Sequence, residues 1–346
     1  MSVHYPTRPI LPVEVLDCIA QKLPPGNILG FIRANTHLHA VGVRALYRDI
    51  PELPAARIVA CLKTLATCPA YAILVRSLFI NWTGCQVVGN LLRLLRRALA
   101  QLRNLQELTV DLCMADSKLS GAWIYSSIGL CLRRFSTSAL CDAPLSRFLE
   151  TQHHLEELTL RGSEYLGLYR GAQRMEPFAL SPFALPRLHC FRTVSVRSPL
   201  LAQVLKDRPV VSVTLSLMPG DGFTSLDALT LSCGPVERLT IMSMDCINPV
   251  DTLLEIATRL PRLQMLHLVV LLAQFDHQIL SECTCALSHF SELQHITVVS
   301  GTGGALSDEH DIATCWHKCC PTLNTIILPK GQVWYQQDNK WICDTT

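Results

Sequence analysis

Leu155-Glu-Glu-Leu-Thr-Leu160 is the stretch from which the fold of this 346-residue chain can be inferred. Leu158 and Leu160 alternate with the polar Thr159, the pattern of a strand that buries one face. The same phrase, with other apolar residues in place of leucine, occurs ten times in all. The fourth positions of these blocks are residues 78, 108, 135, 158, 194, 213, 239, 266, 296 and 326. Their mean spacing of about 28 residues predicts a repeated structural unit.

Helical periodicity separates the blocks in residues 86–102, 143–152, 249–259, 275–288 and 307–319. A proline commonly stands just before the strand, as Pro186 and Pro261 do, and ends the preceding helix. The period and phrase resemble the leucine-rich repeat. We therefore expect an α/β solenoid with parallel strands on its concave face and helices on its convex face.

The repeat departs from regularity in two ways. Two spacings, of 36 and 19 residues, leave room for an insertion in residues 165–186 and for only a short helix after residue 194. The asparagine that usually follows each strand of such repeats is missing. We expect an irregular arc, closed by the polar and aromatic residues 331–346 as a C-terminal cap.

The N-terminal fifty residues have a different pattern. Apolar residues at Val13, Leu16, Ile19 and Leu23 predict an amphipathic helix, which Pro24-Pro25-Gly26 ends. Two shorter helices are expected in residues 27–33 and 36–47. We therefore divide the chain into a helical domain of residues 1–50 and a repeat domain of residues 51–346.

These N-terminal residues resemble the F-box, through Leu11-Pro12-x-Glu14-x-Leu16 at the start and Ala45-Leu-Tyr-Arg-Asp-Ile50 at the end. Residues 34–38 read Ala-Asn-Thr-His-Leu, where the family often has a stretch like Cys-Arg-x-Trp. The resemblance implies docking onto the Skp-type linker of a cullin–RING ubiquitin ligase. The residues that it places at the linker are Leu11, Pro12, Leu16 and Ile19.

The resemblance also implies that the repeats hold a protein substrate, so the chain would be an adaptor and not an enzyme. Side chains between the buried strand positions face outward on the concave surface. The substrate-binding residues that we expect there are Arg134, Arg161, Arg197, Arg238 and His267. The alternative is a ligase-independent scaffold or inhibitor, in which the N-terminal helices only cap the solenoid.

Other kinds of site find little support in the sequence. The formal charge of +2 gives no general attraction to nucleic acid or membrane, and the arginines of residues 91–103 fit a solvated outer helix. Cys315, His317, Cys319 and Cys320 lack the spacing of a zinc site. Gly301-Thr-Gly-Gly304 is only a partial nucleotide-binding pattern. We expect no catalytic, metal or cofactor residues.

Sixteen cysteines within apolar segments fit small core residues in a reducing compartment. Residues 1–13 lack the apolar region of a secretory signal, and the longest apolar run is far shorter than a membrane span. The sequence therefore favours a protein of the cytoplasm or nucleus.

Overall fold

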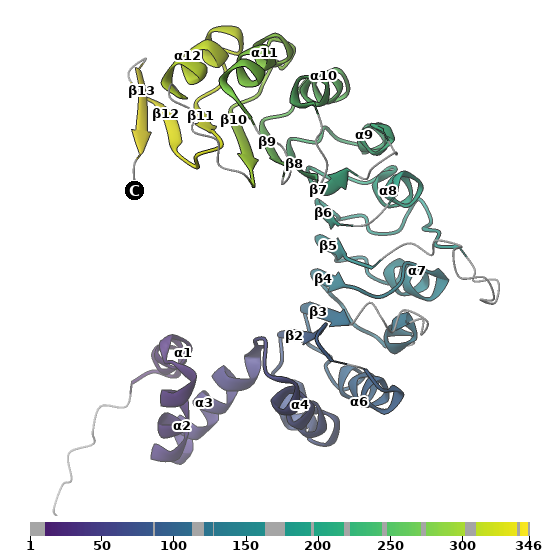
Figure 1. Cartoon of the computed structure of the whole chain (residues 1–346). Coiled ribbons are helices and arrows are strands. Elements are labelled where there is room, and N and C mark those ends of the chain that lie inside the picture. The colour runs from purple at the N-terminus through teal and green to yellow at the C-terminus, as the bar shows by residue number, and fades with distance from the viewer. Residues whose placement is uncertain are drawn as a thin grey trace, which may run out of the picture. The chain divides into compact units, whose positions relative to one another are not determined.

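The computed structural model describes residues 11–85, 87–112, 121–126, 128–162, 177–194, 197–217, 222–243, 248–270, 275–301, 309–337 and 340–344. The chain forms two compact units: Met1–Cys113 with Ser127–Leu132, and Met114–Ser126 with Arg133–Thr346. Both units are α/β structures in which most strands are parallel (Figure 1). The expected α/β class is confirmed. The domain boundary that we expect at residue 50 stays a prediction.

Three helices begin the first unit: α1 (Val13–Lys22), α2 (Pro25–Ala34) and α3 (Thr36–Arg48). Pro25 starts α2, a position where its missing N–H costs nothing. Asn35 starts α3 by accepting a hydrogen bond from the Leu38 backbone N–H at 2.8 Å. Leu16 and Ala20 of α1 pack against Val41 of α3 in a small hydrophobic core.

The rest of the first unit alternates strands and helices. Its elements are β1 (Asp49–Ile50), α4 (Ala55–Thr67), α5 (Pro69–Ala72), β2 (Ser77–Trp82), α6 (Gly89–Leu99) and β3 (Glu107–Leu112). Strand β1 follows α3 directly and pairs with β2, where Ile50 lies opposite Leu78. Tyr47 near the end of α3 stacks on Tyr71 of α5, with ring centroids 4.8 Å apart. The N-terminal helices are therefore continuous with the first parallel strands.

The second unit repeats this alternation. It contains η2 (Gly121–Tyr125), β4 (Arg134–Thr137), α7 (Ala143–Glu150), β5 (Glu157–Leu160), β6 (Cys190–Thr193), α8 (Ser198–Leu205), β7 (Ser212–Leu217), α9 (Thr224–Leu229), β8 (Arg238–Ser243), α10 (Pro249–Arg259), β9 (Met265–Val270), α11 (His277–Leu287), β10 (His295–Ser300), α12 (Glu309–Cys319) and β11 (Thr325–Ile327). Strands β4 to β11 pair in chain order and in parallel. The helices of this unit lie on one side of its strands (Figure 1).

The register of the strands follows the central apolar position of the repeat. The sequence predicts ten central apolar residues, one for each strand. Nine of them pair in register with the central residue of an adjacent strand. The exception is Val194, which we expected in β6 and which is 45% exposed. Phe191 takes its place, between Leu158 and Val213, because Phe191 and Leu188 are both fully buried. The expectation for this repeat is therefore wrong by three residues.

The C-terminal residues, which we expected to cap the last strand, form a hairpin beside that strand. Strands β12 (Val333–Gln337) and β13 (Lys340–Asp344) make an antiparallel hairpin, and β12 pairs antiparallel with β11. The indole of Trp334 donates to the carboxylate of the buried Glu309, at 3.2 Å. The Nδ1 atom of His317 donates to the Leu323 carbonyl oxygen at 3.0 Å. In a neutral imidazole the other nitrogen is then an acceptor, and Nε2 accepts from the Gln336 side-chain amide at 2.8 Å. Helix α12 thus holds the hairpin at two points.

A buried arginine joins α8 to the residues that lead into β6. Arg208 is 2% exposed and donates to the carbonyl oxygens of Ser181, Ala184, Gln203, Val204 and Lys206 at 2.7–3.2 Å. Glu150 of α7 accepts from both the backbone N–H and the hydroxyl of Ser181, at 2.6 and 3.0 Å. Burial lowers the pKa of Arg208. The arginine satisfies the last carbonyls of α8, which lack helical partners.

Replacing Phe191 with alanine is expected to lower the free energy of unfolding by about 3–5 kcal/mol, because it leaves a cavity between Leu158 and Val213. Replacing the exposed Val194 with alanine should change it by less than about 0.5 kcal/mol. Urea unfolding followed by circular dichroism measures both. The reverse order of effects would restore Val194 as the centre of this repeat.

Replacing Arg208 with methionine is expected to lower the free energy of unfolding by about 3 kcal/mol or more, because five carbonyl groups lose a donor that is itself buried. The matched control is Arg187→Met, since Arg187 is exposed in the same region. The same urea experiment applies. Equal stability of the two variants would contradict the structural role of Arg208.

Candidate functional site

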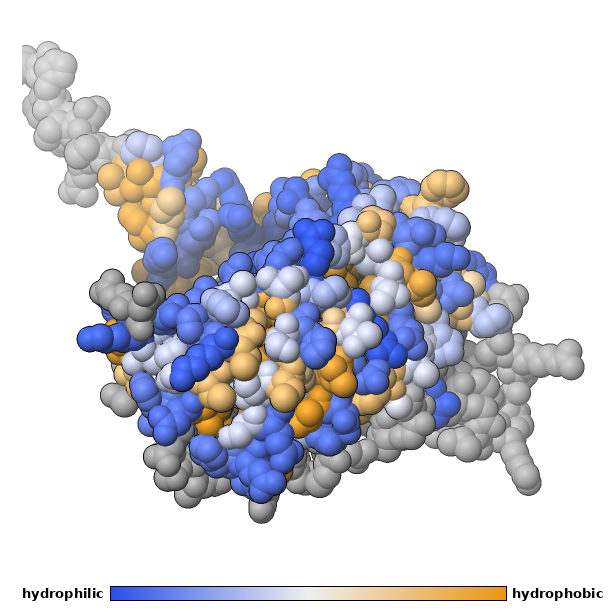
Figure 2. All heavy atoms as spheres, turned by 90° about the horizontal axis from the view of Figure 1, so that it is seen from above, coloured by the Kyte–Doolittle hydropathy of each residue, from blue (hydrophilic) through white to orange (hydrophobic). Residues whose placement is uncertain are grey.

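Helix α1 presents aliphatic side chains on two sides. Leu16 is 8% exposed and packs on Val41, whereas Leu11, Val15 and Ile19 are 49%, 42% and 39% exposed. Val15 and Ile19 are four residues apart and share one face of the helix, and Leu11 precedes the helix, beyond the extended backbone of Pro12. Figure 2 shows hydrophobic atoms gathered on the N-terminal helices. This exposed row is the first candidate surface, which we call the α1 face.

The residues predicted to bind a linker divide between the two sides of α1. Leu11 and Ile19 belong to the α1 face, and Pro12 is exposed beside Leu11. Leu16 instead lies in the small core, because its position shares the side of α1 that packs on α3. Val15 joins the exposed row although it was not predicted. The four-residue step from Val15 to Ile19 was the signal that could have identified it.

The second candidate surface, called here the strand face, consists of the outward side chains of β4 to β10. Arg134, Arg238 and His267 occupy outward positions, and Arg161 continues the alternation just after β5. Arg134, Arg161 and Arg238 are exposed, and His267 is half-buried. The structure therefore brings four of the five predicted substrate-binding residues to one side of the second unit.

Arg197 does not lie on a strand. It is the N-cap of α8, and its carbonyl accepts from Leu201 at 3.1 Å. The three-residue error in the register of β6 explains this, because the outward arginine of β6 is Arg192. Arg192 could have been found from Leu188-His-Cys-Phe191, which also fits the repeat phrase and precedes it directly.

A carboxylate lies between two arginines on the strand face. Glu157 of β5 is 3.9 Å from Arg134 of β4 and 3.9 Å from Arg192 of β6. The arginine side chains are 53% and 56% exposed, and Glu157 is 30% exposed. Both separations exceed hydrogen-bond distance, and exposed ion pairs contribute little to stability. The arrangement therefore leaves the strand face accessible to an anionic partner.

The other end of the strand face is less charged. His267 of β9 and His295 of β10 have outward positions on neighbouring strands, and both are half-buried. Burial lowers the pKa of His267, and the nearby His295 lowers it further. His267 is therefore mainly neutral at pH 7. Met242 and Met265 lie beside it as half-buried outward side chains.

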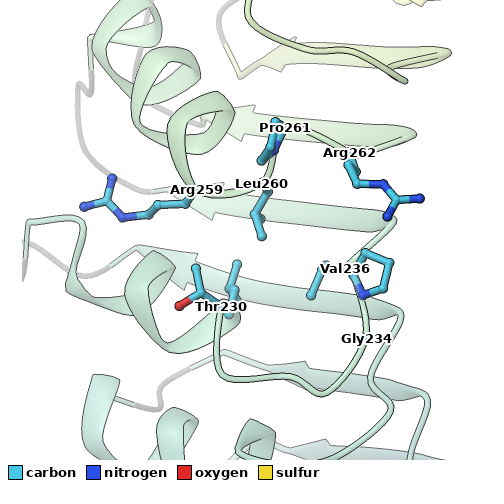
Figure 3. Close-up of a pocket in the computed structure, with 9 residues that line it drawn as sticks. Thr230, Gly234, Val236, Arg259, Leu260, Pro261 and Arg262 are labelled. Atoms are coloured by element: carbon cyan, nitrogen blue, oxygen red, sulfur yellow. The ribbon is translucent and has the colours of Figure 1, made fainter.

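A cavity of about 220 Å³ lies between the α9–β8 loop and the α10–β9 turn (Figure 3). Leu260, Pro261 and Val236 give it an apolar lining. The guanidinium groups of Arg259 and Arg262 point away from each other. Each already forms an ion pair: Arg259 with Asp227 at 2.6 Å, and Arg262 with Glu292 at 3.0 Å. The volume is below the usual range of small-molecule sites, and no catalytic pair converges on it.

No group of three or more potential metal ligands occurs among the residues that the structure describes. Each described cysteine is a free thiol, and burial raises the pKa of Cys283 to about 12. His317 contacts Leu323 and Gln336 rather than a cysteine. The glycine run of residues 301–304 lies largely outside the described residues. No helix of the described chain has both the length and the apolar character to cross a membrane.

The lowered pKa of His267 predicts a pH effect on stability. Below about pH 6.5 the unfolded chain takes up a proton more readily than the folded chain, so stability falls with falling pH. Replacing His267 with asparagine should reduce this fall between pH 6.5 and 5. Urea unfolding at several pH values measures it, and an unchanged pH dependence would contradict the effect of burial on His267.

Comparisons with protein-family models and with curated proteins find no match for this chain. The two surfaces must therefore be interpreted from their own geometry. The α1 face offers exposed aliphatic side chains on a short helix. The strand face offers arginines, histidines and hydroxyl groups on the parallel strands of the second unit.

Proposed function

We propose that the protein is a substrate-recognition adaptor of a Skp–cullin–F-box type ubiquitin ligase. The α1 face would bind the Skp-type linker, and the strand face would bind a protein substrate. In this proposal the second unit is a leucine-rich-repeat arc with strands on its concave face and helices on its convex face. The adaptor performs no chemistry and raises the effective concentration of substrate beside the ligase.

The observation that carries the proposal is the exposed aliphatic row of α1. Leu11, Val15 and Ile19 remain accessible although a neighbouring side of α1 is buried in a core. An amphipathic helix that docks in a groove uses anchors at such spacings. The F-box resemblance begins at the same residues, which gives the α1 face a partner of known class.

The strand face supports the second half of the proposal. Its outward side chains come from consecutive strands, so together they form an extended surface without a catalytic cluster. Solenoids use surfaces of this kind to bind other proteins. Arginine is enriched among the residues that dominate such interfaces. Arg134, Arg161, Arg192 and Arg238 are therefore the side chains that we propose to contact the substrate.

A second candidate is the ligase-independent scaffold or inhibitor. It is favoured by the junction of the N-terminal helices with the sheet, where Ile50 pairs with Leu78 and Tyr47 stacks on Tyr71. Helices joined in this way cap the first strands of the unit whether or not they bind a linker. In that case the α1 face would have no linker-binding role.

The test is capture of a purified Skp-type linker by the full chain. Introducing Leu11→Asp and Ile19→Asp together is expected to lower linker binding at least about 100-fold, because two aspartates enter an apolar contact. Both side chains are exposed, so the fold should survive. The matched control is Val88→Asp, since Val88 is an aliphatic residue with 61% exposure elsewhere in the unit.

Capture by the wild type and the Val88 variant, but not by the double variant, would support the adaptor. No capture by the wild type would favour the scaffold. Equal capture by all three chains would exclude the α1 face as the linker site. Circular dichroism of each variant would confirm that its helices are retained.

A further inference from the structure

The outward side chains of the strand face have a net positive charge, whereas the region of the chain that contains these strands has a net negative charge. Residues 133–346, which contain β4 to β10, have 21 carboxylate side chains against 17 of Lys or Arg. Among the described outward positions from β4 to β10, including Arg161 after β5, there are four arginines and two histidines but a single carboxylate, Glu157. A region of negative net charge thus folds with a positive strand face. Such a surface attracts anionic partners.

The spacing of the arginines follows from the sheet. Arg134, Arg192 and Arg238 belong to β4, β6 and β8, so each lies two strands from the next, and Arg192 lies two residues further along its strand than the other two. Measured across the strands, two strand spacings correspond to about 10 Å, which is close to the length of three residues of a peptide in the polyproline II conformation. Because the polyproline II conformation has three residues per turn, a peptide that crosses the strands in it can present every third side chain to successive arginines.

Glu157 indicates which anion suits this surface. Its carboxylate lies at equal distances from Arg134 and Arg192, so a carboxylate fits between arginines at this spacing. The guanidinium group binds carboxylates through paired N–H donors. More than half of each arginine side chain is exposed, so the arginines can turn from Glu157 to a partner.

We propose that the strand face between β4 and β8 binds an extended acidic peptide segment of a partner protein, whose carboxylates pair with Arg134, Arg192 and Arg238. The inference rests on the proposed function in taking this partner to be the substrate. Serine and threonine at outward positions of the same strands, such as Ser212, Thr214 and Thr240, can donate to the peptide backbone or side chains. Glu157 acts as an internal competitor of the acidic segment.

The test uses the full chain and a fluorescent twelve-residue peptide with glutamate at every third position, in a serine and glycine background. Fluorescence anisotropy measures its Kd at low and physiological salt. Replacing Arg192 with glutamine should weaken binding about tenfold, and replacing Arg192 and Arg238 together should weaken it further. Glu157→Gln should strengthen binding several-fold, because it removes the competing carboxylate.

The matched control removes an equal charge elsewhere. Arg93 and Arg97 are exposed on α6, and replacing both with glutamine should leave the Kd within twofold of the wild-type value. Loss of binding in this variant, or no gain from Glu157→Gln, would overturn the assignment to the strand face. Binding only of a phosphoserine version of the peptide would overturn the choice of carboxylates.

The peptide assay does not involve the Skp-type linker, so it can fail or succeed independently of the adaptor proposal. A chain that binds the peptide but not the linker supports the strand-face inference and excludes the adaptor. A chain that binds the linker but not the glutamate peptide supports the adaptor and excludes an acidic segment as the ligand of the strand face.

Discussion

The contact on which the second unit depends is the stacking of one buried apolar side chain on the next, from strand to strand. Phe135, Leu158 and Phe191 illustrate it: each lies opposite its neighbour in register and is almost fully buried. Because side chains alternate along a strand, fixing one buried position also fixes which residues face outward. The arginines of the strand face are therefore brought to one side by the packing of apolar neighbours, without direct contacts among themselves.

Much of the fold could be predicted from the sequence, because a repeat provides many observations of one pattern. Nine strand centres followed from the spacing of apolar residues alone. The tenth did not, since residues 188–196 contain two overlapping versions of the phrase. The version centred on Val194 ends in the apolar Val196, whereas the version centred on Phe191 ends in Thr193, so the alternation of residue types favours the wrong register. Only the packing of Leu188 and Phe191 beneath neighbouring strands distinguishes them, and that depends on residues distant in sequence.

The candidate surfaces were predictable to different degrees. Arg134, Arg161, Arg238 and His267 could be placed because each lies a fixed step from a correctly identified centre. On α1 the apolar spacing does not distinguish Leu16, which is buried, from Ile19, which is exposed. That distinction requires the position of α3, against which only one side of α1 packs. The buried Arg208 was not anticipated, because its partners are carbonyl groups that no side-chain pattern reveals.

The hairpin of β12 and β13 has a consequence for how a chain of this kind can change in length. A parallel strand at the end of a sheet has a free edge on which one more parallel strand could pair. In this protein the antiparallel β12 occupies that edge of β11, and Glu309 and His317 hold the hairpin to α12. A further repeat added after β11 would have to displace these contacts. Insertion or removal of a strand–helix unit is therefore expected to be tolerated more readily within the ladder of parallel strands than between β11 and the hairpin, where it would break these contacts.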